Sequence, residues 1–308
     1  MTVLPTGEQF LLRCAGPDED TEAVVVEVGA GLRSYRVDGR DLVDGYGERE
    51  MPVGARGHVL VPWPNRLRDG RYTWDGEEHS TPLSEPETHN AIHGLARYVA
   101  WRVTDRTSET VRLEHLLHPQ PGYPFGLRLQ IDYELSAGGL RVTTTATNEG
   151  DVPLPYGEGH HPYVAAGAGL RVDDCTLVAP GATRLETDER GLPTGAVAVE
   201  GTAYDLRAGR PVGDLVIDHC FTDLSRDDDG LARVRLTGPD GRGAAVWVDG
   251  AYSHLQLFTG DVLPERQRQG LAVEPMTCPP NAFATGESVI RLEPGESTTG
   301  TWGLAPLG

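Results

Sequence analysis

Short runs in which apolar and polar residues alternate recur along the chain, and this period of two constrains the fold more than any other feature. In the run Leu127–Leu135 (LRLQIDYEL), every second residue from Leu127 is apolar, and the residues between are Arg, Gln, Asp and Glu. Because successive side chains of a strand point to opposite faces, the run predicts a strand with one buried and one solvated face. Further strand-like runs are Ala23–Val28, Val111–Leu117, Leu140–Ala146, Ala232–Leu236 and Ala244–Val248.

Turn signals separate these runs. Asp-Gly occurs seven times, and two of these dipeptides, at Asp69 and Asp75, bracket the short run Arg71–Trp74. Asp-Gly favours the tight turn of a β-hairpin, in which both central residues have positive φ. Sustained helical periodicity is almost absent, and we expect one helical turn around Ala91–Tyr98.

These patterns predict an all-β fold, a large antiparallel β-sandwich with very little helix. No linker or change of composition divides the chain, so we expect residues 1–308 to form a single domain. No apolar run approaches the roughly 18–20 residues of a membrane span, and the N-terminal segment lacks the features of a signal peptide. We therefore expect a cytoplasmic protein. The four cysteines are widely spaced and predict neither a disulfide framework nor a zinc site: Cys14, Cys175, Cys220 and Cys278.

All 27 basic residues are arginine, against 46 acidic residues and a net charge of −19. Codon bias is sufficient to explain the lack of lysine, yet the lack still excludes Schiff-base chemistry and the lysine of a phosphate-binding loop. The acidic balance disfavours nucleic acid and anionic membranes as partners. We expect a small-molecule ligand, no nucleic-acid or membrane partner, and a monomer or a homodimer.

Two polar segments carry candidate binding residues. In Val61–Tyr72 (VPWPNRLRDGRY), Asn65 and Arg66 follow two prolines, and a guanidinium suits sugar hydroxyls or a carboxylate. In Thr88–Gly94 (THNAIHG), two histidines lie four residues apart. That spacing suits a metal on a helix, but no further ligand stands at the distance that zinc enzymes use. A plain surface arginine and a hydrogen-bonded turn histidine are the structural alternatives.

Two further segments carry candidate acid–base residues. Pro155–Val164 (PYGEGHHPYV) contains His160 and His161, which in a strand would point to opposite faces, so that one faces a pocket. Its HH pattern is not the HxH pattern of metal-binding cupins, and we expect no metal. Glu274 follows the apolar run Leu271–Val273, and a carboxylate at the end of a buried strand is costly unless it is paired or functional.

Taken together and in order, these segments resemble the aldose 1-epimerase (galactose mutarotase) family, in what looks like a less characterised bacterial branch. The resemblance runs from about Gly57 to about Gly300. The matching elements are Asn65-Arg66 before Gly70-Arg71-Tyr72, Asn90 with His93-Gly94, His161-Pro162-Tyr163, Asp218-His219-Cys220-Phe221, and Glu274-Pro275.

The resemblance implies a galactose mutarotase-like supersandwich and a cofactor-free isomerase that interconverts the anomers of a hexose. The position of Glu274 resembles the general base of the family, and that of His161 its general acid. His161 is preferred to His160 because it directly precedes the Pro-Tyr step. The positions implied to hold the sugar are Asn65, Arg66, His93, Tyr163 and Asp218.

Two alternatives remain open at this point. A non-catalytic sugar-binding protein would keep Arg66 and the aromatic residues Trp63, Tyr163 and Phe258, but it would not need an acid–base pair. An epimerase for an anionic sugar, such as a hexose 6-phosphate or a sulfonated hexose, would need a cationic pocket. The arginines near the proposed site in sequence are Arg66, Arg68, Arg71 and Arg97.

Overall fold

The alternating runs form strands, and they pair as an antiparallel sandwich. The computed structural model describes residues 3–16, 20–167 and 169–308. It is about 49% strand and 4% helix. On the strand Leu127–Ser136 the residues of the predicted apolar face are buried, while Arg128, Gln130 and Asp132 are partly exposed. The period of two therefore predicted this strand correctly, and all six predicted runs overlap observed strands.

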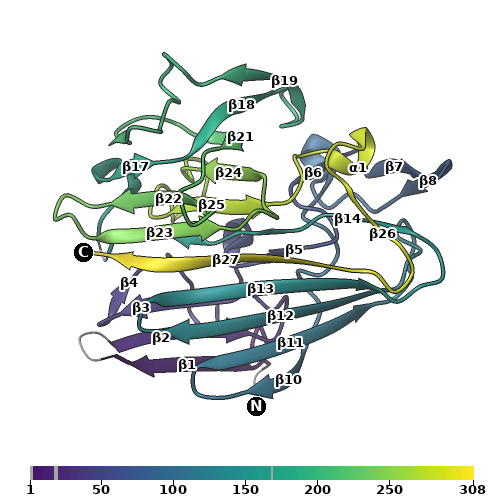
Figure 1. Ribbon diagram of the computed structural model, residues 1–308, viewed down its shortest axis with the longest axis horizontal. Helices are drawn as coiled ribbons and strands as arrows, with labels where there is room; N and C mark the ends of the chain where they lie inside the picture. Colours follow the sequence, from purple (N-terminus) through teal and green to yellow (C-terminus); the bar gives the residue numbers. More distant parts are fainter. Residues whose placement is uncertain (1–2, 17–19, 168) are drawn as a thin grey trace.

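A nine-stranded sheet runs across the molecule (Figure 1). Across the sheet its strands are β10 (Arg102–Arg106), β11 (Thr110–Leu117), β12 (Leu127–Ser136), β13 (Gly139–Asn148), β27 (Ser297–Leu307), β23 (Gly243–Val248), β22 (Ala232–Thr237), β17 (Thr176–Val178) and β20 (Arg210–Pro211). Neighbours that are far apart in sequence, such as β13 and β27, are brought together here.

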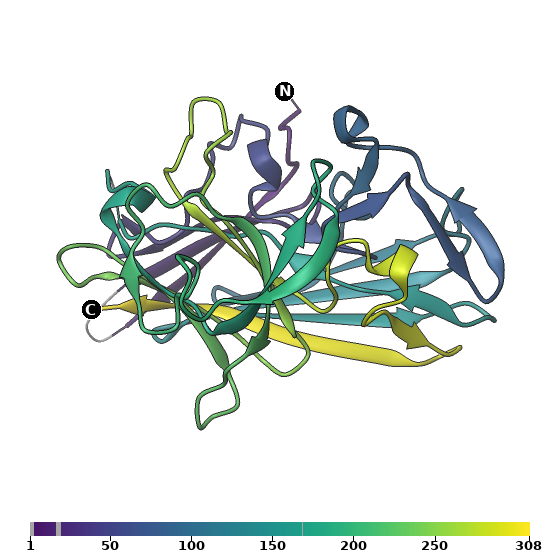
Figure 2. The same cartoon turned by 90° about the horizontal axis from the view of Figure 1, so that it is seen from above.

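An eight-stranded sheet contains three of the expected site residues, Tyr163, Asp218 and Glu274. Its strands are β19 (Pro193–Ala198), β18 (Gly181–Thr187), β21 (Asp218–Leu224), β24 (His254–Phe258), β25 (Leu271–Met276), β15 (Gly159–His160) and β5 (Val59–Leu60), with β16 (Tyr163–Val164) also paired to β25. The green and teal strands of this sheet lie above β27 in Figure 1 and in front of it when the molecule is seen from above in Figure 2.

The remaining elements are shorter. A four-stranded sheet contains β1 (Gln9–Ala15), β2 (Asp20–Val26), β3 (Leu32–Val37) and β4 (Arg40–Asp41). Three strand pairs are β6 (Arg66–Arg68) with β9 (Asn90–Ile92), β7 (Arg71–Trp74) with β8 (Glu77–Ser80), and β14 (Leu154–Tyr156) with β26 (Ile290–Leu292). The helical elements are α1 (Ala282–Thr285) and the 3₁₀ turns η1 (Val53–Ala55), η2 (Pro86–Thr88) and η3 (Val172–Asp174).

One apolar cluster lies between the sheets. Leu12 of β1, Ile131 of β12 and Val273 of β25 are fully buried members of this cluster. Burial of each such side chain stabilises the fold by roughly 1.5–3 kcal/mol. Within the described residues, no helix has both the length and the apolar character that a membrane span requires.

The turn predictions had mixed outcomes. Asp75-Gly76 has positive φ at both residues and closes the hairpin between β7 and β8, as predicted. The expected helical turn at Ala91–Tyr98 is wrong. Residues 90–92 form β9, and His93 and Gly94 then adopt left-handed φ values of 62° and 67°, which a right-handed helix cannot contain.

Candidate active site

All seven site residues expected from the sequence line one cleft of about 380 Å³. They are Asn65, Arg66, His93, His161, Tyr163, Asp218 and Glu274. The sheet register explains how the two carboxylates converge. Asp218 of β21 pairs with Phe258 of β24, and Glu274 of β25 pairs with Gln256 on the other side of β24. Since Gln256 and Phe258 are two residues apart, these positions share one face of the sheet.

The pairing of β6 with β9 brings Asn65 beside His93. Both residues have left-handed φ values, 54° and 62°. The backbone N–H of His93 donates to the carbonyl oxygen of Asn65 at 2.9 Å, and the backbone N–H of Asn65 donates to His93 Nδ1 at 3.2 Å. Since Nδ1 accepts a hydrogen bond, the neutral ring carries its proton on Nε2. Burial lowers the pKa of His93 well below its usual value, so the ring is neutral at pH 7.

The adjacent histidines lie in different environments. His160 is in the core, where its Nε2 lies 3.0 Å from Thr144 Oγ1 and its ring is 5.1 Å from that of Trp302. His161 lies in the cleft, with Nε2 3.3 Å from Glu274 Oε1. Burial lowers the pKa of His161 to about 3. The cleft therefore contains His161, and His160 supports the sheet behind it.

Glu274 is a buried carboxylate that lines the cleft, with 2% of its surface exposed. Its Oε1 contacts His161, whereas Oε2 has no hydrogen-bond partner among the described residues. Burial raises the pKa of Glu274 well above its usual value, the nearby Asp218 raises it further, and Arg66 lowers it. A buried oxygen without a partner is costly in a folded protein, and such groups mark functional sites.

Arg66 is paired with the carboxylate of Glu85, a residue that was not predicted from the sequence. Its Nε and one terminal nitrogen donate to the two oxygens of Glu85, both at 2.9 Å. Gln256 is a second missed residue, and its Nε2 donates to Asp218 Oδ1 at 2.7 Å. Both residues line the cleft. Alternation identifies strands but not which strands pair, so no sequence signal pointed to these contacts.

Tyr163 contributes its ring rather than its hydroxyl. Its OH donates to the carbonyl oxygen of Gly54 at 2.9 Å. The ring stacks on His161, with 5.0 Å between ring centroids, and the guanidinium carbon of Arg56 lies 4.2 Å from its centroid. Arg56 is in turn paired with Asp44 at 2.8 Å. This stack fixes the orientation of the His161 ring.

The four arginines near the site in sequence do not converge. Arg66 and Arg97 line the cleft, whereas Arg68 and Arg71 do not. Arg97 donates to the carbonyl oxygen of Ile92 at 3.0 Å and forms no ion pair within the described residues. Partial burial lowers the pKa of Arg97, which remains a cation at pH 7.

Of the aromatic residues expected for stacking on a sugar, Tyr163 and Phe258 line the cleft. Trp63 does not, because it is buried against Phe283 with ring centroids 5.4 Å apart.

His93, His161 and Glu274 form the cluster with metal-like spacing, since one donor atom from each lies within 4.8 Å of the others. The donor chemistry of His93 does not fit a metal. A metal-bound histidine donates its second ring N–H to an acceptor, whereas here His93 Nδ1 accepts the N–H of Asn65. Its other nitrogen carries the proton, so neither nitrogen offers a free lone pair.

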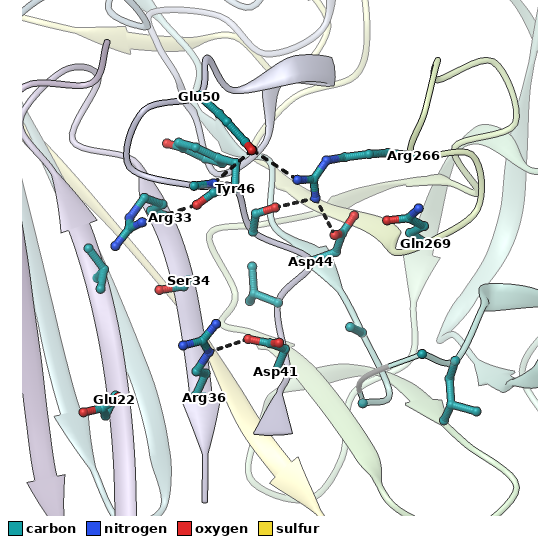
Figure 3. Close-up of a pocket in the computed structure, with 18 of the residues that line it drawn as sticks. Glu22, Arg33, Ser34, Arg36, Asp41, Asp44, Tyr46, Glu50, Arg266 and Gln269 are labelled. Carbon is teal, nitrogen blue, oxygen red and sulfur yellow. Dashed lines mark hydrogen bonds and ion pairs between the residues drawn. The ribbon is translucent and has the colours of Figure 1, made fainter. Parts of the chain in front are cut away.

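A larger cavity of about 870 Å³ lies beside the four-stranded sheet (Figure 3). None of the seven expected site residues lines it. Most of its arginines are paired with carboxylates, such as Arg36 with Asp41 at 2.5 Å and Arg266 with Asp44 at 3.0 Å. Arg33 instead donates to the carbonyl oxygen of Tyr46 at 3.4 Å. The two expected acid–base residues, His161 and Glu274, line the smaller cleft and not this cavity, so the smaller cleft is the candidate site.

Comparison with known proteins identifies the family of this chain. The family model described as aldose 1-epimerase matches residues 15–304. The protein YihR of Escherichia coli (strain K12), which is uncharacterised, is 36% identical over 278 residues, covering 90% of this chain and 87% of that protein. The galactose mutarotase of Rattus norvegicus is 30% identical over 287 residues, covering 84% of this chain and 80% of that protein.

Solved structures share the fold. A GalM/aldose epimerase homologue from C. elegans superposes with a TM-score of 0.85 at 18% identity, covering 97% of this chain and 99% of that one. A galactose 1-epimerase from Lactobacillus acidophilus gives a TM-score of 0.78 at 23% identity, covering 98% and 99%. These matches confirm the predicted β-sandwich class. The chain belongs to the aldose 1-epimerase family, whose members are isomerases that act on sugars.

Proposed function

We propose that this enzyme interconverts the α and β anomers of a free hexose by acid–base opening and reclosure of the ring. The observation that carries the proposal is the 3.3 Å contact between Glu274 Oε1 and His161 Nε2 in a buried cleft. The second oxygen of Glu274 has no partner among the described residues, so it is free to accept a hydroxyl proton from a sugar.

In this mechanism Glu274 removes the proton of the C1 hydroxyl while His161 protonates the ring oxygen. The bond between C1 and the ring oxygen breaks, and the product is an open-chain aldehyde. Rotation about C1–C2 presents the other face of the carbonyl group. On ring closure Glu274 returns its proton to the C1 oxygen, and the hydroxyl formed from the ring oxygen returns its proton to His161. Each positioned proton transfer contributes a factor of roughly 10²–10⁴.

Glu274 and His161 lie side by side, with 3.3 Å between Glu274 Oε1 and His161 Nε2. This arrangement suits the reaction, because the C1 hydroxyl and the ring oxygen are bonded to the same carbon. Other cleft residues are assigned to sugar hydroxyls. Arg66 and the Nε2–H of His93 donate, Asp218 accepts, and the side chain of Asn65 completes this wall.

The test is the rate of anomer exchange. With α-galactose or α-glucose as substrate, polarimetry should record faster approach to equilibrium in proportion to enzyme concentration. Saturable sugar binding without faster exchange would instead support a non-catalytic sugar-binding protein. An enzyme inactive on both sugars would redirect the assignment to another hexose.

A second candidate substrate is a hexose with an anionic substituent, and Arg97 is the observation that favours it. Arg66 and Arg56 are neutralised by Glu85 and Asp44, whereas Arg97 lines the cleft with no carboxylate paired to it among the described residues. An unpaired, partly desolvated guanidinium suits a phosphate or sulfonate, which it can bind through two parallel hydrogen bonds.

This candidate predicts that kcat/KM for a hexose 6-phosphate or a sulfonated hexose exceeds that for the parent sugar. Arg97→Gln should remove the preference. Arg68→Gln is the matched control, because Arg68 lies outside the cleft. Equal rates for neutral and anionic sugars would exclude an anionic preference.

We also propose a cytoplasmic location. All four cysteines are unpaired, and three of them are buried. Disulfide-free cysteines agree with a reducing compartment. Fractionation of the native host, with a periplasmic marker as control, tests the location.

A further inference from the structure

A turn far from the catalytic segments in sequence reaches across to the cleft. It joins β18 to β19 and spans residues 188–192. Asp188 Oδ1 accepts the backbone N–H groups of Arg190 at 2.9 Å and Leu192 at 3.0 Å. The N–H of Asp188 donates to the carbonyl oxygen of Leu192 at 2.9 Å. These bonds give the turn one defined shape, so a residue on it has a fixed direction.

From this turn the side chain of Arg190 forms hydrogen bonds to the segment at the end of η2, residues 88–90. Its Nε donates to the carbonyl oxygen of Thr88 at 2.9 Å. A terminal nitrogen donates to the carbonyl oxygen of His89 at 2.7 Å, to Asp69 Oδ1 at 2.8 Å and to Asn90 Oδ1 at 3.2 Å. Asn90 Nδ2 donates back to the carbonyl oxygen of Arg190 at 3.0 Å. The planar guanidinium thus connects four residues that lie about a hundred positions earlier.

The same hydrogen-bond network extends to Arg66 in the cleft. Asn90 Nδ2 also donates to Glu85 Oε2 at 3.3 Å, and the hydroxyl of Thr88 donates to the same carboxylate oxygen. Glu85 is the bidentate partner of Arg66. The residues that Arg190 fastens are therefore the ones that hold the carboxylate of Glu85 in place.

Gly191 contacts Arg66 directly. A Cβ placed on Gly191 would lie 2.6 Å from a terminal nitrogen of Arg66 and 2.9 Å from its Cζ. The φ of Gly191 is +72°, a left-handed conformation that favours glycine. The turn backbone thus closes one side of the space that the Arg66 guanidinium occupies.

We propose that Arg190 and Gly191 are positioning residues that set the place of the Arg66 guanidinium, and through it the affinity of the cleft for its sugar. Arg190 acts through Asn90 and Glu85, and Gly191 acts by contact. This inference rests on the proposed function of the same cleft. Since neither residue lines the acid–base pair, their effect falls on substrate binding rather than on proton transfer.

The experiment measures kcat and KM for anomer exchange in four variants. Arg190→Ala should raise KM roughly ten- to hundredfold, because a small displacement of a substrate-holding group has effects of this size. Its kcat, measured at a pH where the wild-type rate is at its maximum, should stay within about threefold of wild type. Arg190→Lys should recover only part of the affinity, since an ammonium cannot replace the fork of donors. Gly191→Ala should also raise KM, by displacing Arg66.

Glu189→Ala is the matched control, because Glu189 is an exposed residue on the same turn. Its KM should equal that of wild type. Thermal unfolding of each variant separates loss of fold from loss of affinity, and Gly191→Ala keeps every side-chain bond of Arg190. Unchanged KM in both Arg190→Ala and Gly191→Ala overturns the proposal. A loss of kcat at unchanged KM overturns it as well.

The outcome can be separated from failure of the proposed function. If the wild-type protein does not accelerate anomer exchange, the mutarotase assignment fails by itself. The positioning role is then measured as the Kd for galactose by titration calorimetry. A weaker Kd in Arg190→Ala and Gly191→Ala, with Glu189→Ala unchanged, supports it, and equal Kd values refute it.

Discussion

Replacement of Glu274 by glutamine tests whether Glu274 acts as the general base. Glutamine has the same shape and leaves an oxygen that can remain near His161 Nε2, where Glu274 Oε1 lies at 3.3 Å. What it loses is the ability to accept a proton. The expected loss of kcat is a factor of roughly 10²–10⁴, which corresponds to about 2.7–5.4 kcal/mol on the barrier.

The same substitution should not damage the fold. Burial disfavours the charged form of Glu274 and raises its pKa well above the usual value, so the neutral amide resembles the form that the fold prefers. We therefore expect the midpoint of thermal unfolding to equal or exceed that of wild type. This separates a chemical effect from a structural one.

The assay is two-dimensional exchange NMR of galactose at equilibrium, in which cross-peaks between the α and β C1 protons report the rate directly. Spontaneous exchange without enzyme is subtracted. Glu200→Gln is the matched control, because Glu200 is an exposed carboxylate in a turn. A folded Glu274→Gln protein that keeps more than roughly a tenth of the wild-type kcat would refute the assignment of Glu274 as the base.

Three further predictions concern histidine and carboxylate groups. His160→Ala should lower the free energy of unfolding by roughly 2–4 kcal/mol in urea titrations, because it removes a buried ring and a hydrogen bond, while kcat per folded molecule stays near wild type. Asp218→Asn should move the acid limb of the kcat/KM profile to lower pH, because Asp218 raises the pKa of Glu274; an unmoved limb would contradict that coupling. Burial raises the pKa of Glu158 from 4.5 to about 7, so its protonated form stabilises the fold. That stabilisation is full below about pH 4.5 and is lost as the pH rises through about 7, and Glu158→Gln should flatten this part of the stability profile measured by thermal unfolding.

The sequence predicted the strands well because burial on one face of a sheet imposes a period of two, as in Leu127–Ser136. It failed at Ala91–Tyr98, where two consecutive left-handed residues stop any helix and no composition signal marks them. The seven expected site residues all line the cleft. They could be predicted because each lies in a short motif that is visible in the sequence. Their roles remain predictions until the variants are measured.

Residues that act through long-range contacts could not be predicted. Glu85 and Gln256 are identified by the residues they bond, Arg66 and Asp218, and the register of β24 against β21 and β25 determines the second contact. Arg190 is a stronger case, because its partners lie about a hundred residues earlier. Spacing along the chain contains no information on such pairs until the sheets are assembled.

The pKa shifts place one constraint on the mechanism. Burial raises the pKa of Glu274 and lowers that of His161, so burial favours the neutral form of each group. The proposed reaction needs the opposite arrangement, a carboxylate and an imidazolium. Moving the proton across the 3.3 Å contact changes no net charge, so it avoids the cost of burying an isolated ion. A sugar that donates its C1 hydroxyl to Glu274 and accepts from His161 through its ring oxygen stabilises the charged pair. We therefore propose that substrate binding selects the protonation state in which Glu274 acts as the base and His161 as the acid at neutral pH.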